Sequence, residues 1–324
     1  MIQLTDIRKP IEAELQSFGK LYDSALSQRD GILGKICEGI SQNKGKLMRP
    51  ILLMLVAKEW GGVEEPALHA AITMELLHNA TLVHDDIVDE SNERRGKPSM
   101  RSLFGNKAAV LAGDYLLSSA LEHASLTGNI TVVHNVSLLG KELSEGEILQ
   151  LFNTRFRDLS EETYFEIIRL KTATFFATAA RLGAIVNNAG DEMINQMSRL
   201  GEVIGLCFQI RDDIFDYYDN TNIGKPTGAD MAEGKLTLPA LYAINSTQDA
   251  AMLAIAAKVK QGTASKQEIA DLVEFTKQHS GIDYAQDYMT RLSAEAKSLI
   301  ANLQNTEIKA ALNAYIDFVS ARTM

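Results

Sequence analysis

The feature that most constrains the fold is a long stretch without proline. The chain has 324 residues and only six prolines, and residues 99–225 contain none. Proline is the strongest helix breaker, so this stretch can form long helices. Its apolar residues recur at intervals of three and four, as they do between Tyr164 and Phe175. This periodicity indicates helices and not strands.

The same periodicity continues along the rest of the chain, and no convincing strand remains. Ser160 is a candidate N-cap, and Ser265 with Glu268 has the spacing of a capping box. No low-complexity linker interrupts the series, so we expect one all-α domain over residues 1–324. Helices are predicted at residues 5–27, 29–41, 46–60, 64–89, 106–126, 130–151, 160–187, 191–219, 236–245, 249–260, 265–279, 281–302 and 305–322.

Composition excludes several classes of protein. The net charge of −10 argues against a nucleic-acid binder, whose affinity comes largely from basic groups. No uncharged apolar run is long enough to span a membrane, and the first residues do not resemble a signal peptide, so a cytoplasmic protein is expected. Cys37 and Cys207 are far apart and form no CxxC pair, which indicates buried free thiols.

Two groups of three aspartates are the main chemical signal. Asp85, Asp86 and Asp89 have the same spacing as a second triplet at residues 212, 213 and 216. On a helix, residues four apart share a face, so each triplet directs two carboxylates the same way. Such carboxylates repel one another, and apolar neighbours add a desolvation cost. A bound hard cation, Mg²⁺ above all, would relieve both costs.

The alternative for one triplet alone is a solvated helix end. Two triplets, each near the end of an apolar helix, make that alternative weaker. The segments 75–98 and 202–226 also share a Glu ten residues before the Asp pair and a following GKP. A duplicated helical hairpin and chance similarity both remain open as explanations.

Basic residues lie where they could bind anions. Single lysines or arginines are usually solvated, but Lys171 lies in an apolar helix, where an amine is costly unless it is paired. Acidic triplets together with cations are typical of a site for diphosphates bridged by metal. The other candidates are Lys46 and Arg49 near a predicted helix start, Arg94 and Arg95 after the first triplet, and Lys225 and Lys235 after the second.

The motifs resemble those of the trans (E-type) isoprenyl diphosphate synthases, specifically the long-chain polyprenyl members. The resemblance covers about residues 44–240, with packing helices expected at 247–324. One departure is Leu47, where the family usually has a basic residue. The matching segments are GKLMRP (45–50), DDIVD (85–89), RRGKP (94–98), GE..Q (146–150), KT (171–172), FQIRDDIFDYYD (208–219), GKPTGAD (224–230) and EGKLTLP (233–239).

The resemblance implies a helical bundle with antiparallel helices around an elongated cavity, and it implies a homodimer. It implies three Mg²⁺ ions, with Mn²⁺ as a substitute, held by Asp85, Asp86, Asp89, Asp212, Asp213 and Asp216. Arg94, Lys171, Lys225 and Lys235 would bind the allylic diphosphate. Lys46, Arg49, His78 and Arg95 would bind isopentenyl diphosphate, although His78 also fits a core histidine. Thr172 and Gln209 would face the allylic cation.

The helix before the first triplet bears on product length. Met74, Leu77, Ala80 and Thr81 lie along one side of it. Short-chain family members have aromatic residues four or five positions before the first Asp, where this chain has Thr81 and Ala80. We therefore expect a long polyprenyl product grown on farnesyl or geranylgeranyl diphosphate, with octaprenyl as the single best prediction. Transient membrane contact at product release stays open.

Four alternatives are weighed against this interpretation. The pattern Glu75-x-x-His78 occurs in di-iron bundles, but those need a second copy, which Glu202 does not start. A terpene cyclase would have a different second motif. A non-catalytic synthase subunit would tend to lose aspartates. A short-chain farnesyl or geranylgeranyl diphosphate synthase is the nearest alternative.

Overall fold

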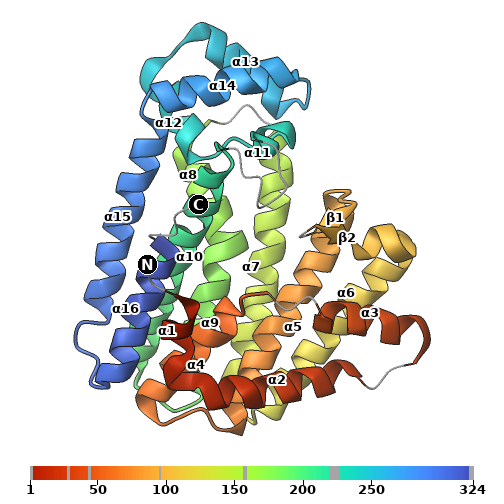
Figure 1. Cartoon of the computed structure of the whole chain (residues 1–324), viewed down its shortest axis with the longest axis vertical. Coiled ribbons are helices and arrows are strands. Elements are labelled where there is room, and N and C mark those ends of the chain that lie inside the picture. Colours follow the sequence, from red (N-terminus) through yellow and green to blue (C-terminus); the bar gives the residue numbers. More distant parts are fainter. Residues whose placement is uncertain are drawn as a thin grey trace. The chain divides into compact units, whose positions relative to one another are not determined.

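The computed structural model describes residues 3–27, 30–42, 45–94, 96–155, 159–218 and 227–320. It is built almost entirely of helices (Figure 1). The elements are α1 (Leu4–Arg8), η1 (Lys9–Ile11), α2 (Glu12–Ser27), α3 (Gly31–Gln42), α4 (Met48–Trp60), α5 (Glu65–Val88), β1 (Glu93–Arg94), β2 (Lys97–Pro98), α6 (Met100–Leu126), α7 (Ile130–Arg155), α8 (Glu161–Ile168), η2 (Arg169–Ala173), α9 (Thr174–Ile185), α10 (Asp191–Phe215), α11 (Ala229–Ala232), α12 (Leu238–Thr247), α13 (Ala250–Lys260), α14 (Lys266–Gln278), α15 (Gly281–Leu299) and α16 (Thr306–Ser320).

Local sequence signals explain where several helices begin. The Ser160 side chain accepts a hydrogen bond from the backbone N–H of Thr163 and caps α8. The predicted capping box of Ser265 and Glu268 is present at the start of α14. Both cysteines are buried and free, as expected. The all-α prediction is confirmed.

The structure corrects some predicted boundaries. Helix α6 contains a kink at Gly105, whose φ of 81° and ψ of 163° are non-helical, so the long part of the helix starts after this glycine, as predicted at 106, and the segment 100–104 before it was not predicted. The predicted helix 5–27 is interrupted by the 3₁₀ turn η1, which contains Pro10. Two short strands, β1 and β2, form an antiparallel hairpin where no strand was expected. The four-residue helix α11 was also missed.

The chain forms two compact units. The first comprises Met1–Leu138, Phe176–Gly201 and Ile300–Ala314. In it, α5 packs along α6 and also against α4 and α2 (Figure 1). Helix α4 is buried over nearly all of its length from Met48 to Ala57, which explains its continuous apolar sequence.

A buried histidine pair lies between α5 and α6 in the first unit. The Nδ1 atoms of His69 and His123 are 2.9 Å apart, so one ring donates a hydrogen bond to the other. Nearby, the Thr73 hydroxyl donates to the carbonyl oxygens of His69 and Ala120. These contacts satisfy polar groups that burial would otherwise leave unpaired.

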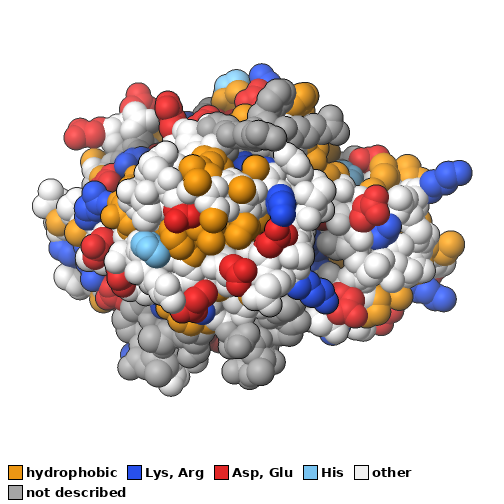
Figure 2. All heavy atoms as spheres, turned by 90° about the horizontal axis from the view of Figure 1, so that it is seen from above, with side chains coloured by type: hydrophobic (Ala, Val, Ile, Leu, Met, Phe, Trp, Pro, Cys, Tyr) orange, Lys and Arg blue, Asp and Glu red, His pale blue; other side chains and the backbone are white. Residues whose placement is uncertain are grey.

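The second unit comprises Leu139–Phe175, Glu202–Leu299 and Tyr315–Met324. Within it, α12 packs against α14 and α15, and α13 packs against α14. Gly281 lets α15 approach α12, because a Cβ there would lie 2.3 Å from the Pro239 carbonyl oxygen. Acidic and basic side chains are interspersed over the face drawn in Figure 2. Within the described ranges, no helix has the length and apolar character needed to cross a membrane.

Candidate functional site

The first aspartate triplet lies at the C-terminal end of α5 in the first unit. Asp85 is half-buried on the last turn, and Asp89 is exposed at the C-cap, where its N–H donates to the Asp85 carbonyl oxygen. The C-terminal end of a helix carries a partial negative charge, so carboxylates there are repelled by the helix as well as by each other. The arrangement favours a bound cation.

Asp86, the middle residue of this triplet, is held differently. It is buried, and its Oδ1 accepts a 2.6 Å hydrogen bond from Nε of Arg94. Burial raises the pKa of Asp86 above its ordinary value, while the Arg94 guanidinium opposes that rise. Arg94 reaches this position from the hairpin of β1 and β2, which turns at Gly96 with a φ of 73°. The ion pair therefore joins the hairpin to α5.

The second triplet lies at the end of α10 in the second unit. Asp212 is half-buried. Asp216 accepts hydrogen bonds from the backbone N–H groups of Ala229 and Asp230 and so caps α11. Asp213 is buried, and its Oδ2 accepts a 2.6 Å hydrogen bond from the hydroxyl of Tyr164. In this triplet, too, the middle aspartate is held by the protein.

The Asp213 carboxyl group is buried, which makes its charged form costly. Burial raises its pKa above the ordinary value, and the carboxylate of Asp230 adds to the rise, whereas hydrogen bonds from Tyr164 and Gln209 oppose it. Burial also raises the pKa of Tyr164, which keeps its hydroxyl protonated as a donor. Among the residues the structure describes, no three His, Cys, Asp or Glu side chains form a metal site by themselves.

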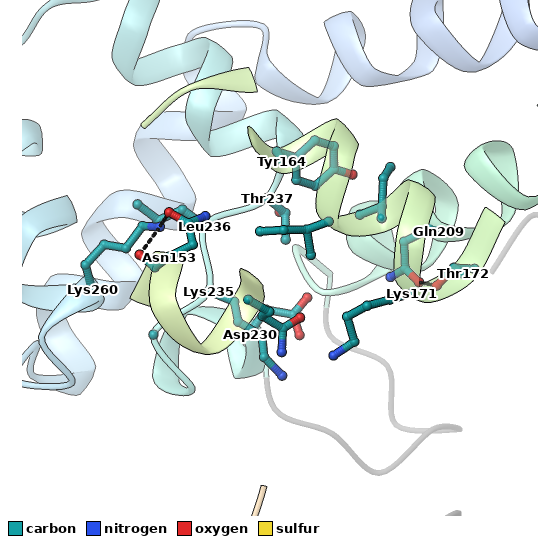
Figure 3. A pocket seen from close by; sticks show the side chains of 14 residues that line it. Asn153, Tyr164, Lys171, Thr172, Gln209, Asp230, Lys235, Leu236, Thr237 and Lys260 are labelled. Atoms are coloured by element: carbon teal, nitrogen blue, oxygen red, sulfur yellow. Dashed lines mark hydrogen bonds between the residues drawn. The ribbon is translucent and has the colours of Figure 1, made fainter. Parts of the chain in front are cut away.

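A pocket of about 210 Å³ lies in the second unit (Figure 3). It contains the predicted residues Lys171, Thr172, Gln209 and Lys235. Figure 3 shows the Lys171 amine and the Asp230 carboxylate reaching into the pocket. The lining residues are Gln150, Asn153, Tyr164, Ile167, Ile168, Lys171, Thr172, Gln209, Asp230, Gly234, Lys235, Leu236, Thr237 and Lys260. Three amines at one pocket make it suited to an anion.

Lys171 lies on η2, a turn of π-helix. The Thr174 N–H donates to the Arg169 carbonyl oxygen, five residues back. Lys171 forms an ion pair with Glu147 of α7, which supplies the partner that an amine in an apolar helix requires. Gly146 permits this pairing, because a Cβ there would lie 2.7 Å from Cβ of Leu170. π-Turns are rare and frequently occur at functional sites.

Thr172 and Gln209 meet beside Lys171. The Thr172 hydroxyl donates to Oε1 of Gln209 at 2.7 Å. The Gln209 amide in turn donates from Nε2 to Oδ1 of Asp213 at 2.8 Å. Because the hydroxyl proton of Thr172 is already donated, its oxygen can offer only lone pairs to a neighbouring group. Such an oxygen suits a positive charge.

Two other amines of the pocket have partners of their own. Nζ of Lys235 is 2.7 Å from Oε2 of Glu233. Lys260 is buried and donates to the carbonyl and side-chain oxygens of Asn153 at the end of α7 (Figure 3). The prediction did not include Tyr164, Asp230 or Lys260 among site residues. Asp230 lay within a matched motif, whereas Tyr164 resembled an ordinary core position.

The predicted isopentenyl diphosphate residues lie in the first unit where they are described. Lys46 is exposed just before α4, and Arg49 lies on its first turn with the guanidinium 4.8 Å from the Phe176 ring centroid. Leu47, the departure from the family pattern, adopts a left-handed φ of 56° at the N-cap. His78 is half-buried on α5. Arg95 and Lys225 lie outside the described residues.

The predicted chain-length residues are on α5. Met74, Leu77 and Ala80 are buried, and Thr81 is half-buried. The Thr81 hydroxyl donates to the His78 carbonyl oxygen at 2.8 Å, which satisfies its polar group within the helix. Small or flexible side chains thus occupy this side of α5.

Known proteins are similar to this chain in sequence and in fold. A sequence model of the polyprenyl synthetase family matches residues 30–276. Octaprenyl diphosphate synthase from Haemophilus influenzae is 31% identical over 315 residues, covering 96% of this chain and 95% of that protein. The structure of geranylgeranyl pyrophosphate synthase from Bacteroides thetaiotaomicron has a TM-score of 0.87 and 47% identity, covering 98% of this chain and 99% of that one.

A further structure contains ligands. Polyprenyl synthase from Caulobacter crescentus CB15, complexed with calcium and isoprenyl diphosphate, has a TM-score of 0.91 and 28% identity, covering 99% of this chain and 98% of that one. The family match and the shared helical fold define an enzyme of isoprenyl diphosphate chemistry. The chain belongs to the polyprenyl synthetase family and is a prenyltransferase, which condenses isopentenyl diphosphate with an allylic diphosphate.

Proposed function

We propose that this enzyme adds isopentenyl diphosphate head-to-tail to farnesyl or geranylgeranyl diphosphate and makes a long all-trans polyprenyl diphosphate, with octaprenyl as the best single assignment. The observation that carries the proposal is the pocket of the second unit. There Lys171 lies next to a Thr172 oxygen that can only accept, so one site offers a cation for a diphosphate and an oxygen for an allylic cation.

Each side chain then has a defined task. Lys171 and Lys235 bind oxygens of the allylic diphosphate and stabilise the charge that grows as it leaves. Arg94 and Lys225 are assigned to the same diphosphate. The Thr172 and Gln209 oxygens orient their dipoles toward the allylic cation. Lys46, Arg49, His78 and Arg95 are assigned to isopentenyl diphosphate, whose double bond must be placed against that cation.

The carboxylates fit a divalent cation. All six lie at or just beyond helix C-termini, where negative charge accumulates, and hard oxygen donors suit Mg²⁺. We assign Asp85, Asp89 and Asp212 as direct ligands. The hydrogen bonds that Asp86, Asp213 and Asp216 accept from the protein hold these side chains in place, and we assign them to support those ligands. Bound Mg²⁺ would supply positive charge to the diphosphate leaving group. The count of three ions follows the family pattern.

Product length rests on α5. Neither Thr81 nor Ala80 would obstruct a growing chain as an aromatic ring would. Several curated relatives are named for long products, including the octaprenyl diphosphate synthase from Haemophilus influenzae. The second candidate is a geranylgeranyl diphosphate synthase. The 47% identity to the Bacteroides thetaiotaomicron enzyme favours it, because that identity exceeds those of the long-chain relatives.

One reaction distinguishes the two candidates. The enzyme is incubated with radiolabelled isopentenyl diphosphate and each of geranyl, farnesyl and geranylgeranyl diphosphate, with Mg²⁺ or with EDTA. We expect elongation only with Mg²⁺ and products of hexaprenyl to decaprenyl length by chromatography. Products that stop at geranylgeranyl length would establish the second candidate. Failure to incorporate label from any primer would exclude both.

We also assign a homodimer. Val110, Leu111 and Leu121 are exposed on α6. Val110 and Leu121 are eleven residues apart, which places these two close to one line along the helix. A second copy would cover this apolar stripe. Leu111→Glu should lower the sedimentation coefficient to that of a monomer, whereas Ser298→Glu, at an exposed polar position of α15, serves as the charge control. A dimeric Leu111→Glu variant would refute the assignment.

A further inference from the structure

We infer that Tyr164 is a positioning residue that fixes, through Asp213, the orientation of the Gln209 amide beside the reacting carbon. This inference rests on the proposed prenyl transfer and assigns a task to a residue that no motif includes. Tyr164 is on α8, Asp213 and Gln209 are on α10, and all three belong to the second unit.

The two oxygens of Asp213 have different donors. Oδ2 accepts from the Tyr164 hydroxyl at 2.6 Å, and Oδ1 accepts from Nε2 of Gln209 at 2.8 Å. The carboxylate is 3% exposed, so water cannot readily replace either donor. The two donors hold the buried carboxyl group in one orientation. Because Tyr164 binds Oδ2 of Asp213, the other oxygen, Oδ1, faces Gln209.

The carboxylate determines which end of the Gln209 amide faces Thr172. Nε2 of Gln209 donates to Oδ1 of Asp213, so the NH₂ end of the amide faces the carboxyl group. The amide oxygen then points the other way and accepts from the Thr172 hydroxyl at 2.7 Å. If the amide turned over, N–H donors would face Thr172 and the pocket. The local dipole would then oppose a developing cation.

The Tyr164 ring is itself held in place. It is buried and lies edge-to-face against Phe165, with ring centroids 5.2 Å apart, and Phe165 stacks on Tyr288 at 4.7 Å. The Ser160 cap fixes the start of the same helix. A rigid donor of this kind is what orients a functional side chain from behind.

A matched residue separates positioning from simple packing. Tyr284 of α15 also ties α8 to another helix through a carboxylate, because its hydroxyl donates to Oε2 of Glu161 at 2.9 Å. That bond lies at the start of α8 and does not contact Gln209. Tyr284→Phe therefore removes the same chemical bond from the same helix without disturbing the chain of hydrogen bonds at Asp213.

The test compares Tyr164→Phe, Tyr284→Phe and wild type for kcat, both substrate KM values, the Mg²⁺ concentration giving half the maximal rate, and Tm. We expect Tyr164→Phe to lower kcat by about 10- to 100-fold. Both KM values and the Mg²⁺ requirement should stay within about twofold of wild type. Tyr284→Phe should keep the wild-type kcat. An unchanged kcat in Tyr164→Phe, or equal losses in both variants, would overturn the inference.

Two additional variants make the test independent of the folding of Tyr164→Phe. Asp213→Asn retains the shape of the side chain but has one acceptor oxygen in place of two, so it cannot face both Tyr164 and Gln209 with an acceptor. It should lower kcat without raising the Mg²⁺ requirement, whereas a raised requirement would make Asp213 a metal ligand instead. Adding Tyr164→Phe to Gln209→Leu should cause little further loss. Multiplying losses would show that Tyr164 does not act through Gln209.

Wild-type activity in the same assay separates this inference from the proposed function. If wild type elongates the primer and the variants behave as wild type, only the inference fails. If wild type incorporates no isopentenyl unit, the proposed function fails first.

Discussion

Arg94 and Asp86 form an ion pair in which only one partner is shielded from water. The Asp86 side chain is 3% exposed and that of Arg94 is 33% exposed, with 2.6 Å between Nε and Oδ1. The pair therefore stabilises a buried charge on α5 from a hairpin at the surface. It also means that a residue assigned to the allylic diphosphate already has a carboxylate partner.

Removing that arginine should destabilise the fold. Arg94→Gln leaves the buried Asp86 charge without its cation, and we expect a loss of about 1–3 kcal/mol, less than for a fully buried pair because Arg94 is partly solvated. The control is Arg169→Gln, which breaks the more exposed pair with Glu166 and should cost about 0.5 kcal/mol or less. Urea unfolding measures both. Equal losses would contradict the expected difference.

Asp85→Asn should separate activity from stability. It removes an assigned metal ligand, so kcat should fall by more than about 100-fold. It also removes one of three aspartates at the end of α5, so Tm should stay unchanged or rise, in line with a gain of about 0.5 kcal/mol. Asp287→Asn, at an exposed position of α15, is the control. A near-normal kcat in Asp85→Asn would remove this residue from the metal site.

Thr81→Phe should shorten the product. The ring would stand one turn before Asp85, where the growing chain is expected to pass. A wild-type product of octaprenyl length should become several isoprene units shorter, and a wild-type geranylgeranyl product should become farnesyl. Thr81→Val removes the hydroxyl without adding bulk and should leave the length unchanged. Chromatography of the hydrolysed products measures the chain length. Unchanged lengths in both Thr81→Phe and Ala80→Phe would exclude this path for the growing chain.

The histidine pair should make stability depend on pH. Burial, and then the neighbouring His69, lower the pKa of His123 below 6.5, so the folded chain stays neutral there while the unfolded chain binds a proton. The stabilising contribution is therefore present above pH 6.5 and is lost as the pH falls toward the lowered value. The nearby acids are Glu65, 3.6 Å from His69, and Glu122.

His123→Asn keeps a polar partner for His69 but cannot titrate. Its Tm should fall less than that of wild type between pH 7.5 and pH 5.5. His134→Asn, at an exposed position of α7, should keep the wild-type dependence. Parallel curves for wild type and His123→Asn would show that the pair does not couple folding to protons.

The periodicity and capping residues predicted most of the helices because those signals are local. Ser160 and Ser265 act on backbone groups within three residues, and the structure confirms both caps. The α11 turn was missed because its cap, Asp216, lies thirteen residues earlier in the chain.

The candidate site was predictable to a similar extent. Lys171, Thr172, Gln209 and Lys235 were predicted from motifs, and the structure brings them to one pocket. The partner of Lys171 could not be derived from spacing, because Glu147 comes from another helix. Tyr164 was not predicted for a similar reason, because its partner Asp213 also comes from another helix. A tyrosine at a helical apolar interval looks like core packing until the acceptor of its hydroxyl is known.

The π-turn at Arg169–Ala173 makes the placement of Lys171 sensitive to chain length. Deleting one residue between Tyr164 and Lys171 would replace the π-turn with a regular α-helix. Yet the lysine would be rotated by about 100° about the helix axis relative to Tyr164. Substitution scanning would not detect this dependence, because a substitution keeps the number of residues between Tyr164 and Lys171 and therefore keeps the helical register.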